Sequence, residues 1–145
     1  MSERRPAPSR SEFAVFEPIQ TRWDDNDVYG HINNVVYYGY FDTAVNRQLT
    51  KAGLLDVLAG QQIGLVVETG CRYHAPAAFP EALEAGIKVA RIGSSSVRYE
   101  LGIFAEGGEQ AIADGFFVHV YVDRETRRPA ALSEAWRQAL ALWQV

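Results

Sequence analysis

Cysteine is almost missing from this chain of 145 residues, in which Cys71 is the only one. A single cysteine excludes an intrachain disulfide, and it excludes zinc sites built on four cysteines or on paired cysteines and histidines. Long apolar runs are missing as well, since none approaches the roughly 20 residues that a membrane-spanning helix needs. The sequence is therefore not that of a disulfide-stabilised, zinc-finger or membrane-spanning protein.

An excess of basic residues is also missing. The formal net charge is −4, with 14 lysines and arginines against 18 aspartates and glutamates, and this balance argues against a general nucleic-acid binder. Residues 1–11 contain arginines and prolines but no apolar stretch, so they do not form a signal peptide. We expect residues 1–11 to be a flexible N-terminal tail, residues 12–145 to be a single domain, and the protein to be cytoplasmic.

What the sequence does contain is a polar loop that runs directly into a long apolar segment, over residues 22–52. Apolar and aromatic side chains occupy nearly every position of residues 35–41, as in a helix that is buried on all sides. We predict a helix over residues 34–52. Asn33 is suited to cap the N-terminus of this helix, and Gly53 is suited to end it.

Five segments alternate apolar and polar residues at the spacing of strands. The predicted strands cover residues 12–21, 63–73, 83–92, 96–105 and 110–122, and a final helix capped by Ser133 covers residues 134–142. Pro18 cannot donate to a strand ladder, so the first strand should lie at an edge or carry a bulge. In the second strand, the odd-numbered residues from Leu65 to Tyr73 are expected to share one face.

The order of these elements favours an α+β fold. Short links between the last strands favour antiparallel pairing, and one sheet that covers one apolar helix must curl around it. The edges of such a sheet are templates for further pairing. The apolar strand at residues 63–73 is therefore a candidate for edge-to-edge dimerisation, which would place the polar loop near a subunit boundary.

The polar loop concentrates groups that could carry chemistry. Asp24, Asp25 and Asp27 stand just before the predicted helix, and the first N–H groups of that helix, on Asn34 and Val35, are free to polarise an acyl carbonyl oxygen. A carboxylate opposite them could attack the carbonyl carbon or activate a water molecule. Together these groups would make an acyl-transfer site without serine or cysteine. The alternative is that the three aspartates are solvated loop residues that cap turns.

Other loop residues have more than one possible role. His31 could be a general base, an orienting hydrogen-bond partner or a plain loop residue, and Asn33 could be a substrate ligand instead of a cap. A calcium-binding loop that starts at Asp25 is excluded, because Tyr29 and Val36 fall where oxygen ligands are required. No serine has the surroundings of a catalytic nucleophile. The loop carboxylates therefore stay the candidates for chemistry.

The loop resembles a known signature. Residues 23–37, WDDNDVYGHINNVVY, resemble the D-x-D-x-x-G-H-x-N-N-x-x-Y pattern of hotdog-fold acyl-CoA thioesterases in the 4-hydroxybenzoyl-CoA thioesterase-like family. Similar segments recur at residues 76–80, 91–96 and 122–126, so the resemblance covers nearly the whole chain after the tail. It implies the hotdog fold, in which a five-stranded antiparallel sheet wraps around a long central helix.

The resemblance also implies a homodimer or a homotetramer with its active sites at the dimer interface. Asp27 matches the catalytic carboxylate of the family, and Asn34 matches the residue whose backbone N–H polarises the thioester carbonyl. His31 is the third candidate catalytic residue. Members that act on 4-hydroxybenzoyl-CoA carry a more apolar sequence where this chain has residues 31–34, so the resemblance leaves the acyl group open.

The candidate substrate-binding residues come from two places. Those in the loop and at the start of the helix are Tyr29, Gly30, Asn33 and Tyr37. Those in a polar turn between two later strands are Arg91, Ser94 and Ser95. This turn could hold the phosphates of coenzyme A, because arginine suits phosphate geometry, but an ordinary serine-rich turn explains it equally well. Weaker candidates for the same role are Arg72, His74, Arg98, Arg127 and Arg128.

We therefore expect a hydrolase that cleaves an acyl-CoA thioester to a free acid and coenzyme A, with no metal, no cofactor and no nucleic-acid or membrane partner. One alternative is a hotdog hydratase or dehydratase in which Asp27 and His31 handle water. Its D-x-N-P-x-H pattern fits poorly, because Asn26 stands five residues before His31. The other alternative is a non-catalytic subunit that binds an acyl thioester.

Overall fold

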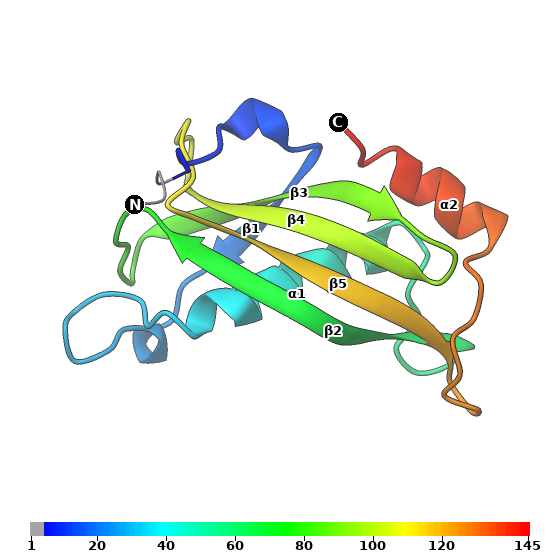
Figure 1. Cartoon of the computed structure of the whole chain (residues 1–145). Coiled ribbons are helices and arrows are strands. Elements are labelled where there is room, and N and C mark those ends of the chain that lie inside the picture. Colours follow the sequence, from blue (N-terminus) through cyan, green and yellow to red (C-terminus); the bar gives the residue numbers. More distant parts are fainter. Residues whose placement is uncertain (1–4) are drawn as a thin grey trace.

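The fold is one curved antiparallel sheet with a long helix across one face. The structure is a computed structural model that describes residues 5–145. The five strands lie in the order β1-β3-β4-β5-β2, and α1 lies behind the sheet in the view of Figure 1. The strands are β1 (Val15–Gln20), β2 (Gln62–Tyr73), β3 (Ala82–Ile92), β4 (Ser96–Ala105) and β5 (Ala113–Asp123), and the helices are α1 (Val36–Lys51), α2 (Glu134–Ala141) and the short 3-10 helices η1 (Arg10–Glu12) and η2 (Trp23–Asp25). The predicted α+β arrangement of a five-stranded antiparallel sheet around a long helix is confirmed.

Helix α1 buries one face against the sheet. Tyr37, Phe41, Ala44 and Leu49 recur at helical spacing and are all buried, which gives the apolar stripe of a helix that packs on one side. On the other side Val35, just before the helix, is 61% exposed. The expectation of a helix buried on all sides is therefore wrong for a single chain, because the sheet covers only one of its faces.

The start of α1 differs from the expected cap. The helix begins at Val36, and its N-cap position is held by Val35. Asn33 lies two residues before that position, where its carbonyl oxygen accepts the Val36 N–H at 3.0 Å and its Oδ1 accepts the Val35 N–H at 3.2 Å. Asn33 thus satisfies the first helical donors without being the N-cap residue. The end of the helix is as expected, with Gly53 at a φ of +74°.

Strand β2 changes face along its length. Val66 pairs with His119 and Glu68 with Val118 of β5, so Val67 is an extra residue in a bulge. Before the bulge, a Cβ at Gly64 would meet the buried Tyr121 ring at 3.0 Å, on the α1 side. After it, Cys71 and Tyr73 pack against the same core. The prediction that the odd-numbered residues from Leu65 to Tyr73 share one face is wrong, because the extra residue reverses the alternation.

The two edges of the sheet are treated differently. Pro18 lies in the edge strand β1, as predicted. Strand β1 pairs with β3 only up to Ile87, and beyond that point the Val89 N–H donates to the carbonyl of Trp143 at 2.9 Å. The C-terminal segment that holds α2 thus continues the cover of β3, while the other edge, β2, stays open in the single chain.

The N-terminal segment is held to the sheet before β1 begins. The Ala111 N–H donates to the Pro8 carbonyl at 2.9 Å, and the Arg10 N–H donates to the Glu109 carbonyl at 2.9 Å. Arg10 also forms an ion pair of 2.8 Å with Glu84. Part of the predicted tail thus contacts the sheet through Pro8 and Arg10, and residues 1–4 of it lie outside the described residues. The flexible tail and the single domain stay predictions.

A line of polar side chains is buried between the sheet and α1. The hydroxyls of Tyr99 and Tyr121 lie 2.7 Å apart, and the Tyr121 hydroxyl lies 3.4 Å from Nδ1 of His119. Burial lowers the pKa of His119 and raises the pKa of both tyrosines, because it disfavours the charged form of each group. The three side chains therefore stay neutral in the folded chain at neutral pH.

Candidate active site

Asp25, one of the three loop aspartates, holds the loop in place. Asp25 is 1% exposed, and its Oδ2 accepts the Arg22 N–H at 2.8 Å and the Tyr40 hydroxyl at 2.6 Å. Its Oδ1 accepts from Nε of Arg22 at 3.2 Å. Because both oxygens of the buried carboxylate are occupied, Asp25 anchors η2 to α1.

Asp27, the last of the three loop aspartates, belongs to a tight turn. The N–H of Asp27 donates to the His31 carbonyl at 2.8 Å, and the Gly30 N–H donates to the Asp27 carbonyl at 3.1 Å. Gly30 has a φ of +84°, which favours glycine at this position. Oδ1 of Asp27 accepts the Tyr29 N–H at 2.8 Å. The turn extends past the end of the sheet (Figure 1) and exposes Val28 and Tyr29, so Asp27 is presented on a projecting loop.

Asn34, two residues before the first residue of α1, combines a free donor with an anchored carbonyl. The carbonyl oxygen of Asn34 accepts the Tyr73 hydroxyl at 2.7 Å, which ties the loop to the end of β2. The Asn33 N–H donates to the Asp25 carbonyl at 2.8 Å. Across residues 5–145, the N–H of Asn34 has no hydrogen-bond partner. The N–H of Val35 is occupied by Asn33, so of the two expected donors only that of Asn34 is available.

A hollow of about 320 Å³ opens beside this donor. We call it the helix-start hollow, and its lining residues are His31, Ile32, Asn34, Tyr37, Tyr73, His74, Ala75 and Pro76. The structure thus brings together three predicted site residues, His31, Asn34 and Tyr37. Asp27, Tyr29, Gly30 and Asn33 belong to the same loop but do not line the hollow within one chain.

Two residues of the hollow, Tyr73 and His74, are not among the site residues predicted from the sequence. Tyr73 was expected only as one residue of a strand face, and His74 only as a weak candidate for phosphate binding. Both reach the hollow because β2 ends beside the start of α1. Tyr73 is 39 residues away from Asn34 in the sequence, although its hydroxyl contacts the Asn34 carbonyl. The one available signal was the alternation of β2, which the bulge obscured.

The phenolic and thiol groups around the hollow keep their protons. Burial, with smaller contributions from Cys71 and Glu81, raises the pKa of Tyr37 to about 12. Burial is also the main reason why the pKa of Tyr73 is raised and why that of Cys71 is raised to about 11. At neutral pH these groups are hydrogen-bond donors and not bases.

The predicted phosphate-binding turn lies at the other end of the sheet. Arg91, Ser94 and Ser95 stand at the turn between β3 and β4, where the Ser94 carbonyl accepts the Leu132 N–H at 2.9 Å and Nη2 of Arg137 at 3.1 Å. In the view of Figure 1 this turn and α2 lie at the end opposite the loop. A single chain therefore does not bring the turn to the helix-start hollow.

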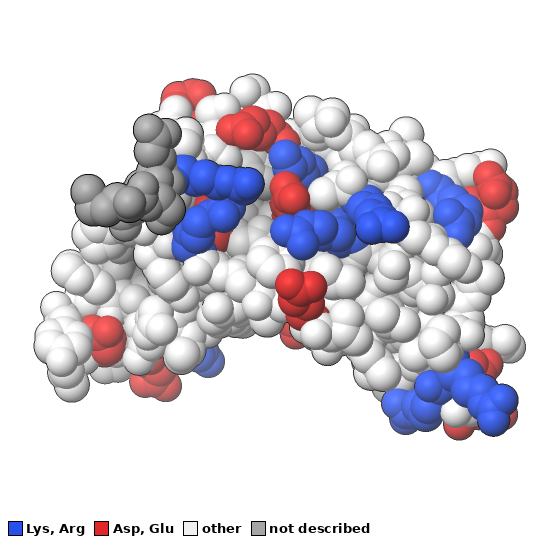
Figure 2. Space-filling model, in the orientation of Figure 1, with Lys and Arg blue, Asp and Glu red and all other residues white. Residues whose placement is uncertain are grey.

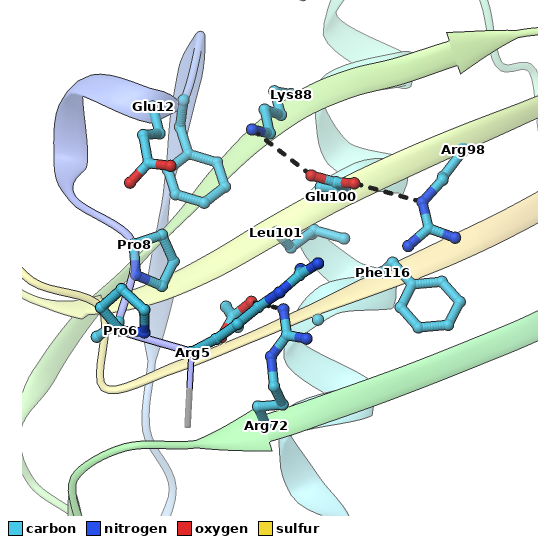
Figure 3. Close-up of a pocket in the computed structure, with 14 residues that line it drawn as sticks. Arg5, Pro6, Pro8, Glu12, Arg72, Lys88, Arg98, Glu100, Leu101 and Phe116 are labelled. Atoms are coloured by element: carbon cyan, nitrogen blue, oxygen red, sulfur yellow. Dashed lines mark hydrogen bonds and ion pairs between the residues drawn. The ribbon is translucent and has the colours of Figure 1, made fainter. Parts of the chain in front are cut away.

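A second polar hollow lies on the face of the sheet that α1 does not cover. Figure 2 shows this face, with lysine and arginine side chains gathered over the sheet and acidic side chains among them. The hollow measures about 440 Å³, and Arg72, Lys88 and Arg98 line it. Figure 3 shows these side chains, with Glu100 between Lys88 at 3.5 Å and Arg98 at 3.3 Å. We call it the outer hollow.

Two features are absent from the part of the chain that the structure describes, a membrane-spanning helix and a cluster of metal ligands. No helix among these residues has the length and apolar character to cross a membrane. No three or more histidine, cysteine, aspartate or glutamate side chains among them are grouped so that they could hold a metal ion. The predicted absence of a metal and of a cofactor stays a prediction.

Known proteins resemble this chain over most of its length. The PA5185 protein from Pseudomonas aeruginosa strain PAO1 is 54% identical, with a TM-score of 0.93 over 96% of this chain and 97% of that chain. A thioesterase from Thermus thermophilus, solved with coenzyme A and Zn, is 30% identical, with a TM-score of 0.73 over 90% of this chain and 95% of that chain. The uncharacterized protein YsmA of Bacillus subtilis (strain 168) is 25% identical over 132 residues, which are 90% of this chain and 88% of YsmA.

A family profile identifies the group to which these similarities belong. The profile of the thioesterase-like superfamily matches residues 21–140, from the end of β1 to the end of α2. This range contains the loop, the helix-start hollow and all strands but the first. The chain therefore belongs to the thioesterase-like superfamily, so the predicted family, hotdog fold and class of enzyme, a thioester hydrolase, are confirmed.

Proposed function

We propose that this protein hydrolyses an acyl-CoA thioester to a free acid and coenzyme A. The observation that carries the proposal is the free N–H of Asn34 at the opening of α1, beside a hollow lined by Tyr37 and Tyr73. A thioester carbonyl oxygen docked on this N–H is polarised by a preorganised donor, and the positive end of the helix dipole adds to the effect. Coenzyme A as the thiol is supported by the relative from Thermus thermophilus, which was solved with coenzyme A.

Asp27 is the proposed nucleophile or general base. Asp25 cannot serve, because its oxygens are occupied by Arg22 and Tyr40. In Asp27, only Oδ1 has a partner among the described residues, the Tyr29 N–H, and Oδ2 is left for a water molecule or for the carbonyl carbon. His31, in the same turn, is proposed to bind the substrate or to orient the water.

The proposed unit of function is a homodimer joined by the β2 edges. Leu65, Val66 and Val67 are 42%, 46% and 61% exposed in the single chain, along an edge strand that pairs with β5 on one side and with no strand of residues 5–145 on the other. Antiparallel pairing of two such edges would place the Tyr73 end of one β2 beside the Gln62 end of the other. The projecting loop with Asp27 would then reach the partner subunit. Further pairing to a tetramer, and the cytoplasmic location, stay predictions.

The first experiment is a panel of short, long and aromatic acyl-CoAs assayed for release of free thiol. We expect at least one of them to be hydrolysed, and the preferred one identifies the acyl group. A protein that binds acyl-CoAs but releases no thiol from any of them would be a binding subunit. Release of an enoyl or hydroxyacyl thioester with the C–S bond intact would instead indicate a hydratase or dehydratase.

The dimer is tested by light scattering at micromolar concentration. Val67→Lys places a charge in the open edge, and it should shift the parent dimer toward monomer because charged edges oppose strand pairing. Leu58→Lys is the matched control, because Leu58 is 90% exposed but lies outside the strand. A parent protein that is monomeric at this concentration would contradict the proposed unit.

A further inference from the structure

The end of β2 carries a histidine and a carboxylate that the proposed reaction does not yet use. Nε2 of His74 lies 2.5 Å from Oδ1 of Asp114, and each side chain is only 11% exposed. The other oxygen of Asp114 accepts from Nη2 of Arg72 at 2.7 Å. The imidazole is thus fixed on one side by a carboxylate that is itself fixed, as in sites where a carboxylate orients a histidine for proton transfer.

The free side of this histidine is accessible. His74 lines the helix-start hollow together with Asn34 and Tyr73. In residues 5–145, Nδ1 of His74 has no hydrogen-bond partner. Only one side-chain nitrogen or oxygen in this range is both buried and without a partner, and that atom is Nε2 of His119. Nδ1 of His74 is therefore not buried, and a molecule in the hollow can reach it.

Hydrolysis of a thioester involves two proton transfers, one from the attacking water and one to the leaving sulfur. The attacking water gives up a proton, and the sulfur that leaves must gain one to become a neutral thiol. Among the groups that line the hollow, Tyr37 holds its proton to a pKa of about 12, and the Tyr73 hydroxyl already donates to the Asn34 carbonyl. His31 lines the hollow as well, but it has no carboxylate partner in the part of the chain described here.

We propose that His74 is the general acid that protonates the leaving sulfur, and that Asp114 is the residue that positions it. This proposal rests on the proposed thioester hydrolysis. Water adds to the carbonyl carbon as Asp27 takes one of its protons, the C–S bond then breaks, and the sulfur takes the proton from Nδ1 of His74. Proton transfer from Asp27 through water restores the imidazolium, so one thioester and one water give one acid and one thiol. The Asp114 carboxylate stabilises the imidazolium before transfer.

The experiment compares two leaving groups on the same acyl chain. The first substrate is the acyl-CoA preferred by the parent protein, which releases an alkyl thiol. The second is an aryl thioester, whose thiolate is stable without a proton. A missing general acid slows only the first reaction, so His74→Gln should lower kcat/KM about 10²-fold on the acyl-CoA and only a few-fold on the aryl thioester.

The ratio of the two rates does not depend on how much of a variant is folded, because both substrates report on the same active molecules. Asp114→Asn should change this ratio in the same direction as His74→Gln but less. Arg72→Gln removes the residue that fixes Asp114 and leaves His74 in place, so it should change the ratio less than Asp114→Asn does. Leu58→Lys, at an exposed position away from this pair, is the control, and its ratio should stay near that of the parent.

Two outcomes distinguish this inference from the function on which it rests. If His74→Gln lowers both rates by the same factor, or leaves both unchanged, His74 is not the general acid, although the parent is still a thioesterase. If the parent releases thiol from neither substrate, the proposed thioester hydrolysis is wrong, and with it the role of His74 as its general acid.

Discussion

The two ends of the sheet differ in how completely their polar groups are satisfied. At the turn between β3 and β4 the backbone carbonyls are occupied. Ser94 accepts from Leu132, just before α2, and from Arg137 in α2, and Ser95 accepts from Tyr121 of β5. At the helix-start end, the N–H of Asn34, Oδ2 of Asp27 and Nδ1 of His74 have no partners among residues 5–145.

This difference supports the proposed active site at the helix-start end. Buried polar groups in proteins are almost always hydrogen-bonded, and Asp27 and His74, which are partly buried, each keep one side-chain atom without a partner among residues 5–145. Two carboxylates of a single loop differ in the same way. Both oxygens of Asp25 accept hydrogen bonds, whereas in Asp27, two residues later, only Oδ1 accepts one from the described residues.

The largest effect should come from the carboxylate at the open end. Asp27→Asn keeps the size of the side chain and its bond to the Tyr29 N–H, but removes the nucleophile or base. We expect kcat to fall by about 10²–10⁴, with the fold and the binding of a non-hydrolysable acyl-CoA analogue retained. Asp24→Asn is the control and should cost far less, because Asp24 is exposed. Hydrolysis by Asp27→Asn at near the parent rate would remove Asp27 from the site.

The next effect should come from the satisfied carboxylate of the same loop. Asp25→Ala leaves the Tyr40 hydroxyl and the Arg22 N–H without their acceptor, so the free energy of unfolding should fall by about 3 kcal/mol. Urea unfolding followed by tryptophan fluorescence measures the loss. Asp27→Ala, measured in the same way, should lower the free energy of unfolding much less. Equal decreases in the two variants would show that the two carboxylates contribute equally to stability.

A smaller effect is expected on raising the pH. Burial raises the pKa of Tyr37 from 10.0 to about 12, so the neutral phenol stabilises the fold fully below pH of about 10. Above pH about 10 the Tyr37 phenol ionises in the unfolded chain but not in the folded chain, so the free energy of unfolding decreases until the pH reaches about 12, where the phenol ionises in the folded chain as well. Urea midpoints measured from pH 8 to pH 11 should therefore fall, and they should fall less steeply in Tyr37→Phe. A variant with an unchanged slope would contradict this assignment.

The smallest effect concerns the predicted phosphate-binding turn. Arg91 can be tested as a contact to the phosphates of a coenzyme A molecule whose acyl group lies in the partner subunit. Arg91→Ala should then raise KM a few-fold and leave kcat nearly unchanged, because the lost contact is equally strong in the ground state and in the transition state. Arg98→Ala makes the same test in the outer hollow. An increase in KM for Arg98→Ala alone would move the phosphates to the outer hollow and leave the far end with a structural role only.

The sequence was sufficient for the order and type of the elements, because each depends on a local pattern. Apolar alternation identified all five strands, and Pro18 correctly indicated an edge. The position of Asn33 was close to correct, but its role was not, since a donor at Val36 can be satisfied by a carbonyl as well as by a cap side chain.

The site was predicted only as far as the loop extends. His31, Asn34 and Tyr37 are close in sequence, and the structure places them in one hollow. His74 and Asp114 are 40 residues apart and meet only because β2 pairs with β5. A periodic pattern does not report such a meeting, and a bulge that reverses the pattern conceals it further.

The extra residue at Val67 has a consequence for anyone who builds hybrids of this protein with its relatives. Between Gly64 and Tyr73 the number of residues, more than their identity, decides whether Tyr73 faces Asn34 or the outside. Deleting one residue there would turn the second half of β2 over while the first half kept its place. A crossover point or an alignment gap inside this segment therefore changes the helix-start end of the molecule, even when every side chain of the proposed site is preserved.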